Sequence, residues 1–326
     1  MAPVISRVTT VTSELGEAPH WDEEHNCLYF VDILGKYLQK YNHDTNKVTR
    51  VLIDGAPSII VPVKNHKDHF VISKDKELLV VKWDDHHSDH VHIVERLAEL
   101  DEDKNLRFND GKCDTNGRLW IGSMDLTRKP GVSVPKEQRQ GSLMSFKKKM
   151  YTHLNNIGIS NGIAIDPQRE KLYYIDSDDT DVLEFDIDIQ HGVLSNQKVI
   201  FSFSNHSDLV GKPDGMTIDS DGNLWIANFL GGRVIKIDPR YTDKLLQIID
   251  LPAQVPTSVA FGGKHLNELY VTTASYNPVI QENLPTPANG SLYRITGLGV
   301  KGLPAPKVPI SHFVAFNPLT GYYYYE

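Results

Sequence analysis

Apolar and polar positions along the chain follow one pattern that recurs. Residues 213–227 form an apolar stretch, a polar turn at residues 219–222 and a second apolar stretch. Both apolar stretches are rich in β-branched and aromatic residues, which favour extended backbone. The same turn-plus-strand unit occurs six times, and the first apolar residues after the turns are Leu28, Phe70, Leu119, Leu172, Leu224 and Leu269.

The spacing of these units predicts the fold class. Neighbouring copies lie between 42 and 53 residues apart. A strand-rich repeat of about 40–50 residues is typical of a β-propeller blade. Between the copies, segments such as 182–187 and 233–238 alternate between apolar and polar residues, as expected of outer strands with one exposed face. The sequence therefore predicts an all-β fold, a six-bladed β-propeller.

The ends of the chain complete this picture. Val4 to Thr9 is a strand without a partner in the first repeat, and we expect it to complete the last blade and remove an exposed edge. No linker divides the chain, so residues 1–326 are predicted to form a single domain. The segment after about residue 310 ends in Tyr-Tyr-Tyr-Tyr-Glu and has no repeat partner, so the pattern assigns it no place.

One polar position recurs with the strands. It lies five residues before the first residue of each turn, and its occupants are Glu17, Ser58, Asn109, Asn161, Asp214 and Ser258. Equivalent positions of propeller blades lie at one depth around the central channel, so we expect these side chains to form a ring. Four of them carry carboxylate or carboxamide oxygens, which suit Ca²⁺, Mg²⁺ or Mn²⁺. No His or Cys stands among the six, so nothing favours zinc in particular.

The alternative is that these residues only open strands. Asn-Gly and Asp-Gly are ordinary turn pairs, and Asn161-Gly162 and Asp214-Gly215 fit that interpretation one at a time. The recurrence in one register favours a central metal site instead. Glu17 adds weight, because glutamate is a poor turn former.

Arg107 stands two residues before Asn109, and strand alternation places both side chains on the same side. A guanidinium beside a metal ring can hold an anionic or polyhydroxy substrate through several N–H groups. The alternative is that Arg107 only forms a salt bridge with one of the acids nearby.

Composition limits the possible partners and location. The formal net charge of −8 argues against a nucleic-acid partner, which needs clustered Lys and Arg. No window approaches the ~18 apolar residues of a membrane span, and the N-terminus has no apolar leader. Two cysteines, Cys27 and Cys113, are too few for a disulfide scaffold. We therefore expect a cytoplasmic protein with reduced thiols that acts as a monomer on a small molecule, without membrane partners.

Six short pieces carry a family resemblance, and they span nearly the whole chain: residues 16–21, 107–112, 159–162, 213–216, 258–263 and 296–302. Together they resemble the family of regucalcin (senescence marker protein), gluconolactonase and luciferin-regenerating enzyme. The resemblance implies a six-bladed propeller with one divalent cation on its axis. It places the metal ligands at Glu17, Asn161 and Asp214, the substrate contacts at Arg107 and Asn109, and the general base at Asp214.

One position departs from this family. Vertebrate regucalcins carry a further substrate-contacting Glu shortly after a Gly-Thr-Met strand. Here that strand is Gly122-Ser123-Met124, and Thr127 occupies the position of the Glu. The departure weakens the case for sugar-lactone specificity and favours the insect luciferin-regenerating branch. Thr127 and the loop at residues 128–141 are expected to shape the mouth of the channel.

These observations predict a divalent-metal-dependent hydrolase of lactones, similar to gluconolactonase, in which a metal-activated water attacks the carbonyl. Ca²⁺ is the favoured cation, with Zn²⁺, Mn²⁺ and Mg²⁺ as alternatives. Two other functions stay open: a luciferin-regenerating type of hydrolase of another small molecule, and a non-catalytic, regucalcin-like calcium-binding regulatory protein. Arg107 and Asn109 favour catalysis, because an ion buffer has no need of them.

Overall fold

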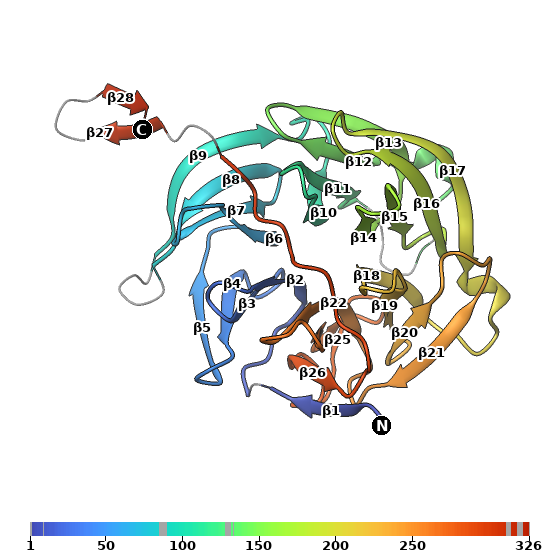
Figure 1. The fold of residues 1–326 in the computed structure, drawn as a ribbon. Helices are drawn as coiled ribbons and strands as arrows, with labels where there is room; N and C mark the ends of the chain where they lie inside the picture. The colour runs from blue at the N-terminus through green and yellow to red at the C-terminus, as the bar shows by residue number, and fades with distance from the viewer. Residues whose placement is uncertain are drawn as a thin grey trace.

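The computed structural model describes residues 2–8, 10–84, 90–127, 132, 134–310, 314–317 and 322–325. Six four-stranded antiparallel sheets stand around a central axis, each with its first strand innermost (Figure 1). The predicted six-bladed β-propeller is confirmed.

The first three blades follow the repeat in chain order. Blade 1 consists of β2 (Gly16–Asp22), β3 (Cys27–Asp32), β4 (Tyr37–Asn42) and β5 (Lys47–Leu52). Blade 2 consists of β6 (Pro57–Pro62), β7 (His69–Lys74), β8 (Glu77–Lys82) and β9 (His92–Glu99). Blade 3 consists of β10 (Leu106–Cys113), β11 (Leu119–Asp125), β12 (Gly141–Phe146) and β13 (Met150–Ile157). The short 3₁₀ helix η1 (Lys136–Gln138) precedes β12.

The other three blades have the same order. Blade 4 consists of β14 (Ser160–Asp166), β15 (Lys171–Asp176), β16 (Asp181–Asp188) and β17 (Val193–Ser202), and η2 (Phe203–Asn205) follows it. Blade 5 consists of β18 (Lys212–Ile218), β19 (Leu224–Phe229), β20 (Arg233–Ile237) and β21 (Leu245–Asp250). Blade 6 consists of β22 (Pro256–Gly262), β23 (Glu268–Thr273), β26 (Tyr293–Thr296) and β1 (Val4–Arg7). Two hairpins stand outside the blades, β24 (Tyr276–Asn277) with β25 (Glu282–Asn283) and β27 (Val314–Asn317) with β28 (Tyr322–Tyr325).

The N-terminal strand closes the ring, as the sequence predicts. β1 pairs antiparallel with β26, from Val4 opposite Thr296 to Arg7 opposite Tyr293. The N–H of Val8 extends this pairing by a bond of 2.9 Å to the carbonyl of Leu292. The last blade therefore joins the two ends of the repeat array in one sheet, and its β26 edge is covered.

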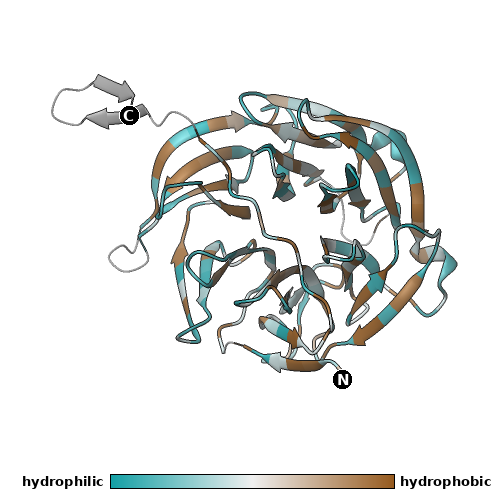
Figure 2. Ribbon diagram, viewed as in Figure 1, coloured by the Kyte–Doolittle hydropathy of each residue, from teal (hydrophilic) through white to brown (hydrophobic). Residues whose placement is uncertain are grey.

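Apolar side chains fill the space between neighbouring blades. The inner strand β2 and its partner β3 are buried at every position, whereas β5 at the rim is mostly exposed. Figure 2 shows hydrophobic residues along many of the strands and hydrophilic residues in many of the turns between them. The second strands, such as β3 with the sequence CLYFVD, read as nearly continuous apolar runs because both of their faces are buried.

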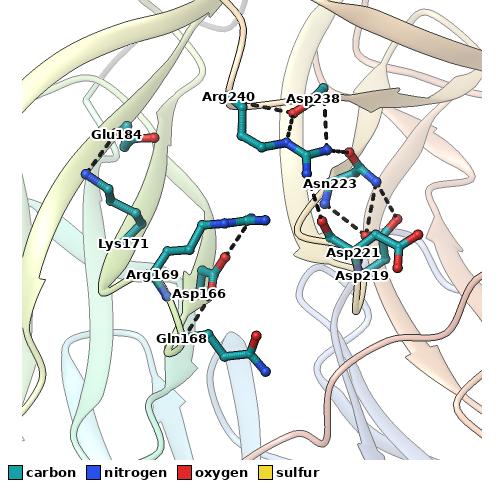
Figure 3. A network of polar contacts seen from close by, with 10 residues as sticks. All are labelled: Asp166, Gln168, Arg169, Lys171, Glu184, Asp219, Asp221, Asn223, Asp238 and Arg240. Carbon is teal, nitrogen blue, oxygen red and sulfur yellow. Dashed lines mark hydrogen bonds and ion pairs between the residues drawn. The ribbon is translucent and has the colours of Figure 1, made fainter.

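The aspartates that open the inter-strand turns are held by several donors. Asp219 accepts hydrogen bonds from the backbone N–H groups of Asp221 and Asn223 and from the indole of Trp225, at 2.9–3.0 Å. Asp114 repeats the arrangement with Trp120. Figure 3 shows the turns at Asp166 and Asp219 with the arginines that bind them and their neighbours. These acids therefore stabilise the turns at one end of every inner strand that carries them.

A segment without a repeat partner, residues 297–310, crosses that same end of the ring; we call it the terminal strap (Figure 1). It bonds to blade 6 through Gly302 and the carbonyl of Leu266, and to blade 2 through Val308 and the carbonyl of Pro62. Lys307 of the strap binds Asp22 of blade 1 at 2.8 Å. The strap thus covers the end of the central channel where the inner strands run into the turns, which we call the turn end.

Two further expectations concern the chain as a whole. Cys27 and Cys113 are both buried, and neither is part of a disulfide. Within the described residues, no helix has the length and apolar character needed to cross a membrane.

Candidate active site

Every inner strand contains a β-bulge close to its start. The pairing with the second strand slips by one residue at each of these places: Glu17/His20, Pro57/Ile60, Phe108/Gly111, Ser160/Ile163, Pro213/Met216 and Pro256/Ser258. A bulge leaves one residue unpaired, bends the strand and redirects a side chain. The six recurring polar residues lie in or beside these bulges, and all six are buried: Glu17, Ser58, Asn109, Asn161, Asp214 and Ser258. We call these six residues the polar register. We call this end of the channel the bulge end.

Gly162 and Gly215, which follow Asn161 and Asp214, have a packing role. A Cβ atom at Gly162 would lie 2.6 Å from the carbonyl oxygen of Asp214, and one at Gly215 would lie 2.0 Å from Oγ of Ser258. Both glycines lie inside strands, within the bulges of β14 and β18, and not in turns. The two pairs therefore do not form turns, and at both places only glycine lets neighbouring blades approach this closely around the channel.

Three buried carboxyl groups influence one another at the bulge end. Burial and the charge of Asp110 raise the pKa of Glu17 to about 8. Burial and the charges of Glu17 and Asp110 raise the pKa of Asp214 well above its ordinary value. Oδ1 of Asp214 is buried and has no hydrogen-bond partner among the described residues. Two repelling acids and an unpaired oxygen fit a bound cation, which would neutralise the acids and occupy the oxygen.

Asn161 is the third residue expected to bind the cation. It comes from β14, next to the strand of Asp214, and is 6% exposed. Its Nδ2 donates to Oγ of Ser177 at 2.7 Å, and its Oδ1 accepts from Nδ2 of Asn109 at 2.8 Å. A divalent cation prefers oxygen ligands of this kind, so Glu17, Asn161 and Asp214 fit as its protein ligands.

Arg107 and Asn109 form the pair that the sequence predicts. Nη1 of Arg107 donates to Oδ1 of Asn109 and to the carbonyl of Phe108, both at 2.8 Å. Burial lowers the pKa of Arg107 to about 10, against the opposing charges of Glu17 and Asp75. The guanidinium is therefore a buried positive charge beside the acids, with both bonds made from Nη1.

Ser58 and Ser258 complete the ring with neutral groups. Oγ of Ser58 lies 2.6 Å from Oγ of Ser73, and the backbone N–H of Ser258 donates to Oγ1 of Thr272. The ring is thus divided: acids and amides come from blades 1, 3, 4 and 5, and hydroxyls come from blades 2 and 6.

Sequence reasoning missed four residues of this region. Asp110 and Lys112 come shortly after Asn109 in the same strand, and neither stands at the recurring polar position, so the repeat gave no signal for them. Nζ of Lys112 donates to the carbonyl of Met216 at 2.7 Å, and burial lowers the pKa of Lys112.

Burial also lowers the pKa of His20 to about 4, and its Nε2 is unpaired among the described residues. His20, Asp110 and Lys112 line a small pocket in the channel. Ser177, the fourth, lies beyond the end of a second strand and outside the register.

Thr127 is not part of the buried group. It is exposed just after β11, and its Oγ1 donates to Oδ1 of Asp125 at 2.7 Å. Its role in substrate contact stays a prediction. Of the loop expected to shape the mouth, residues 128–131 and 133 lie outside the described residues.

A second acidic group lies at the opposite end of the channel. Asp22, Glu24 and His25 bring their ligand atoms within 4.8 Å of one another. Lys307 of the terminal strap binds both carboxylates, at 2.8 and 2.9 Å. This group already holds an ammonium, whereas Glu17, Asp110 and Asp214 form no salt bridge within the described part of the chain.

Comparison with known proteins gives consistent matches over most of the chain. A family model described as "SMP-30/Gluconolactonase/LRE-like region" matches residues 15–275. Regucalcin of Gallus gallus is 37% identical over 293 residues, which are 89% of this chain and 93% of that protein. Regucalcin of Homo sapiens is 38% identical over 291 residues, 88% of this chain and 92% of that protein. A solved structure of a luciferin-regenerating enzyme matches with a TM-score of 0.88 at 39% identity, and covers 95% of this chain and 100% of that one.

Proposed function

The chain belongs to the SMP-30/gluconolactonase/LRE-like family, and we propose that it is a divalent-cation-dependent hydrolase of lactones or related small esters. One observation carries the proposal: the unpaired, buried Oδ1 of Asp214 lies in a group of repelling acids beside a buried arginine. Such an arrangement costs stability unless a cation or a substrate uses it, and perturbed acids of this kind concentrate at functional sites.

Glu17, Asn161 and Asp214 would hold the cation, with Ca²⁺ favoured because all three offer hard oxygen ligands. When bound, a divalent cation supplies Lewis acidity, which polarises an ester carbonyl and lowers the pKa of a water molecule. The alternatives Mg²⁺, Mn²⁺ and Zn²⁺ have different preferred ligand numbers, so relative affinity among them is a measurable property of the site.

The side chains have separate tasks in hydrolysis. Asp214 would accept the proton of the attacking water, because it is a carboxylate that would lie beside the cation. Arg107 and Asn109 hold the oxygens of the substrate, and the guanidinium stabilises the negative charge that develops on the carbonyl oxygen. Burial of this group excludes bulk water, which strengthens each of these interactions.

Thr127 bears on the choice of substrate. The hydroxyl of Thr127 donates a hydrogen bond to Asp125, whereas a glutamate at this position would place a longer, charged side chain after β11. The proposal therefore includes lactones and small aromatic esters alike. It further includes action as a monomer in the cytoplasm on one small molecule, without nucleic-acid or membrane partners.

The test is a panel of sugar lactones, aromatic lactones and aryl esters, assayed with the chelator-stripped protein and after addition of Ca²⁺, Mn²⁺, Mg²⁺ or Zn²⁺. We expect turnover of at least one substrate class that needs the cation and is lost in Asp214→Ala. Turnover that persists after chelation or in Asp214→Ala would contradict the mechanism. No turnover across the panel with intact Ca²⁺ binding would favour a calcium-binding regulatory protein instead.

A further inference from the structure

A row of four hydrogen bonds runs through blades 3, 4 and 5 at the bulge end. Arg107 donates to Oδ1 of Asn109, and Nδ2 of Asn109 donates to Oδ1 of Asn161, both at 2.8 Å. Nδ2 of Asn161 donates to Oγ of Ser177 at 2.7 Å. Ser177 then donates to the carbonyl of Pro213, the residue before Asp214, at 2.6 Å. The row therefore connects the expected substrate contacts with two of the expected cation ligands.

The two ends of the row fix its direction. A guanidinium can only donate, and a backbone carbonyl can only accept. Asn109 must therefore turn its oxygen toward Arg107, and its amino group toward Asn161. The amino group of Asn109 also donates to the carbonyl of Ser160, at 2.8 Å, which gives the same orientation independently. Each amide between the ends has only one orientation that satisfies all its neighbours.

Ser177 controls the last amide of the row. It is 4% exposed, and its single hydroxyl proton is used on Pro213, so its oxygen is an acceptor for Asn161. Without that oxygen, the buried amino group of Asn161 loses its acceptor, which costs about 1–3 kcal/mol and allows the carboxamide to turn. A turned carboxamide would present nitrogen where a cation needs oxygen.

We propose that Ser177 is a positioning residue of the cation site. Its hydroxyl holds the carboxamide of Asn161 with Oδ1 toward the cation, and it fixes the carbonyl next to Asp214 in the same row. The inference rests on the proposed cation site, but its test does not require a substrate. Partners that orient metal ligands typically change metal affinity by about 10–100-fold when they are removed.

The test compares Ser177→Thr with Ser177→Val in the full-length, chelator-stripped protein, by calorimetric titration with Ca²⁺ and separately with Mn²⁺. Threonine and valine add the same bulk and differ in the hydroxyl. We expect affinity about 10–100-fold weaker for Ser177→Val and within about threefold of wild type for Ser177→Thr. Ser177→Ala removes the hydroxyl without added bulk and gives a second reading if valine prevents folding.

Two controls separate this inference from the proposed function. Ser145→Ala removes another buried hydroxyl, which bonds to His153 in blade 3, and should leave cation affinity unchanged. Glu17→Gln should abolish cation binding if Glu17 is a ligand of the cation.

Wild-type affinity in Ser177→Val and Ser177→Ala, with binding lost in Glu17→Gln, would overturn the role of Ser177 without contradicting the proposed cation site. Equal losses in the threonine and valine variants would assign the effect to bulk. Absence of Ca²⁺ and Mn²⁺ binding by the wild type would overturn both proposals.

Discussion

In the inner strands β2 and β18, the two ends carry acidic residues in different environments. Glu17 and Asp22 stand at the two ends of β2, and Asp214 and Asp219 stand at or just beyond the ends of β18. At the turn end, Asp219 accepts from two backbone N–H groups and an indole, and Lys236 lies 3.0 Å from its Oδ2. At the bulge end, Oδ1 of Asp214 has no such partner among the described residues.

The pKa values express the same contrast. Burial raises the pKa of Asp22, but hydrogen bonds from Lys307 and His25 offset this and lower it overall. Burial raises the pKa of Glu17 to about 8, and the charge of Asp110 adds to the effect. The same inner strand thus carries Asp22, which stabilises the fold through its hydrogen bonds, and Glu17, whose burial costs stability. The second kind of carboxylate is what a binding site requires.

The largest expected effect concerns the bulge end. Asp214→Asn removes a charged ligand and also the repulsion with Glu17. We expect cation affinity to fall roughly 1,000-fold, about 4 kcal/mol, while stability in chelator is unchanged or higher. Calorimetric titration and urea unfolding measure the two quantities. A loss of stability in chelator together with wild-type affinity would reverse the assignment of the two ends.

The next effect concerns the turn end. Asp219→Ala leaves the indole of Trp225, two backbone N–H groups and the ammonium of Lys236 without their acceptor. We expect a loss of about 3–5 kcal/mol in the free energy of unfolding. Asp219→Asn, which keeps one acceptor oxygen, should lose less, and both variants should bind Ca²⁺ like the wild type at a temperature where they are folded. Weaker binding in the folded variants would show that the ends are not independent.

The smallest effect concerns the terminal strap. Lys307→Met removes the bonds to Asp22 and Glu24, and should lower the free energy of unfolding by about 1–3 kcal/mol at pH 7. Because the folded-state pKa of Asp22 is lowered, this stabilisation is present above the ordinary carboxyl pKa and is lost as pH falls through the folded value. The difference between variant and wild type should therefore shrink below about pH 4. Lys301→Met, an exposed change on the same strap, should cost less than about 0.5 kcal/mol.

The repeat and its polar register could be predicted because both are periodic along the chain. Six units of similar length require six blades, and a fixed offset from the turn places Glu17, Asn161 and Asp214 at one depth. The unpaired segment Val4–Arg7 likewise predicts the closing strand. These features depend on local pattern and on ring closure alone.

The remaining features depend on contacts that no local pattern encodes. The bulges require the register of two strands to be compared, and this register is visible only after pairing. Ser177 follows β15, whereas its partners Asn161 and Pro213 lie in β14 and β18. Its role therefore depends on how closely blades 4 and 5 pack together. The terminal strap has no repeat partner, and its contacts with Asp22 and Val63 exist only because the ring is closed.

The most direct test is an anomalous-difference map from crystals of the full-length protein loaded with Mn²⁺. We expect one strong peak at the bulge end, within bonding distance of Glu17, Asn161 and Asp214. We expect no ion between Asp22, Glu24 and His25, where Lys307 already supplies a positive charge. A map without a peak at the bulge end, or with its only peak at the turn end, would contradict the proposed cation site.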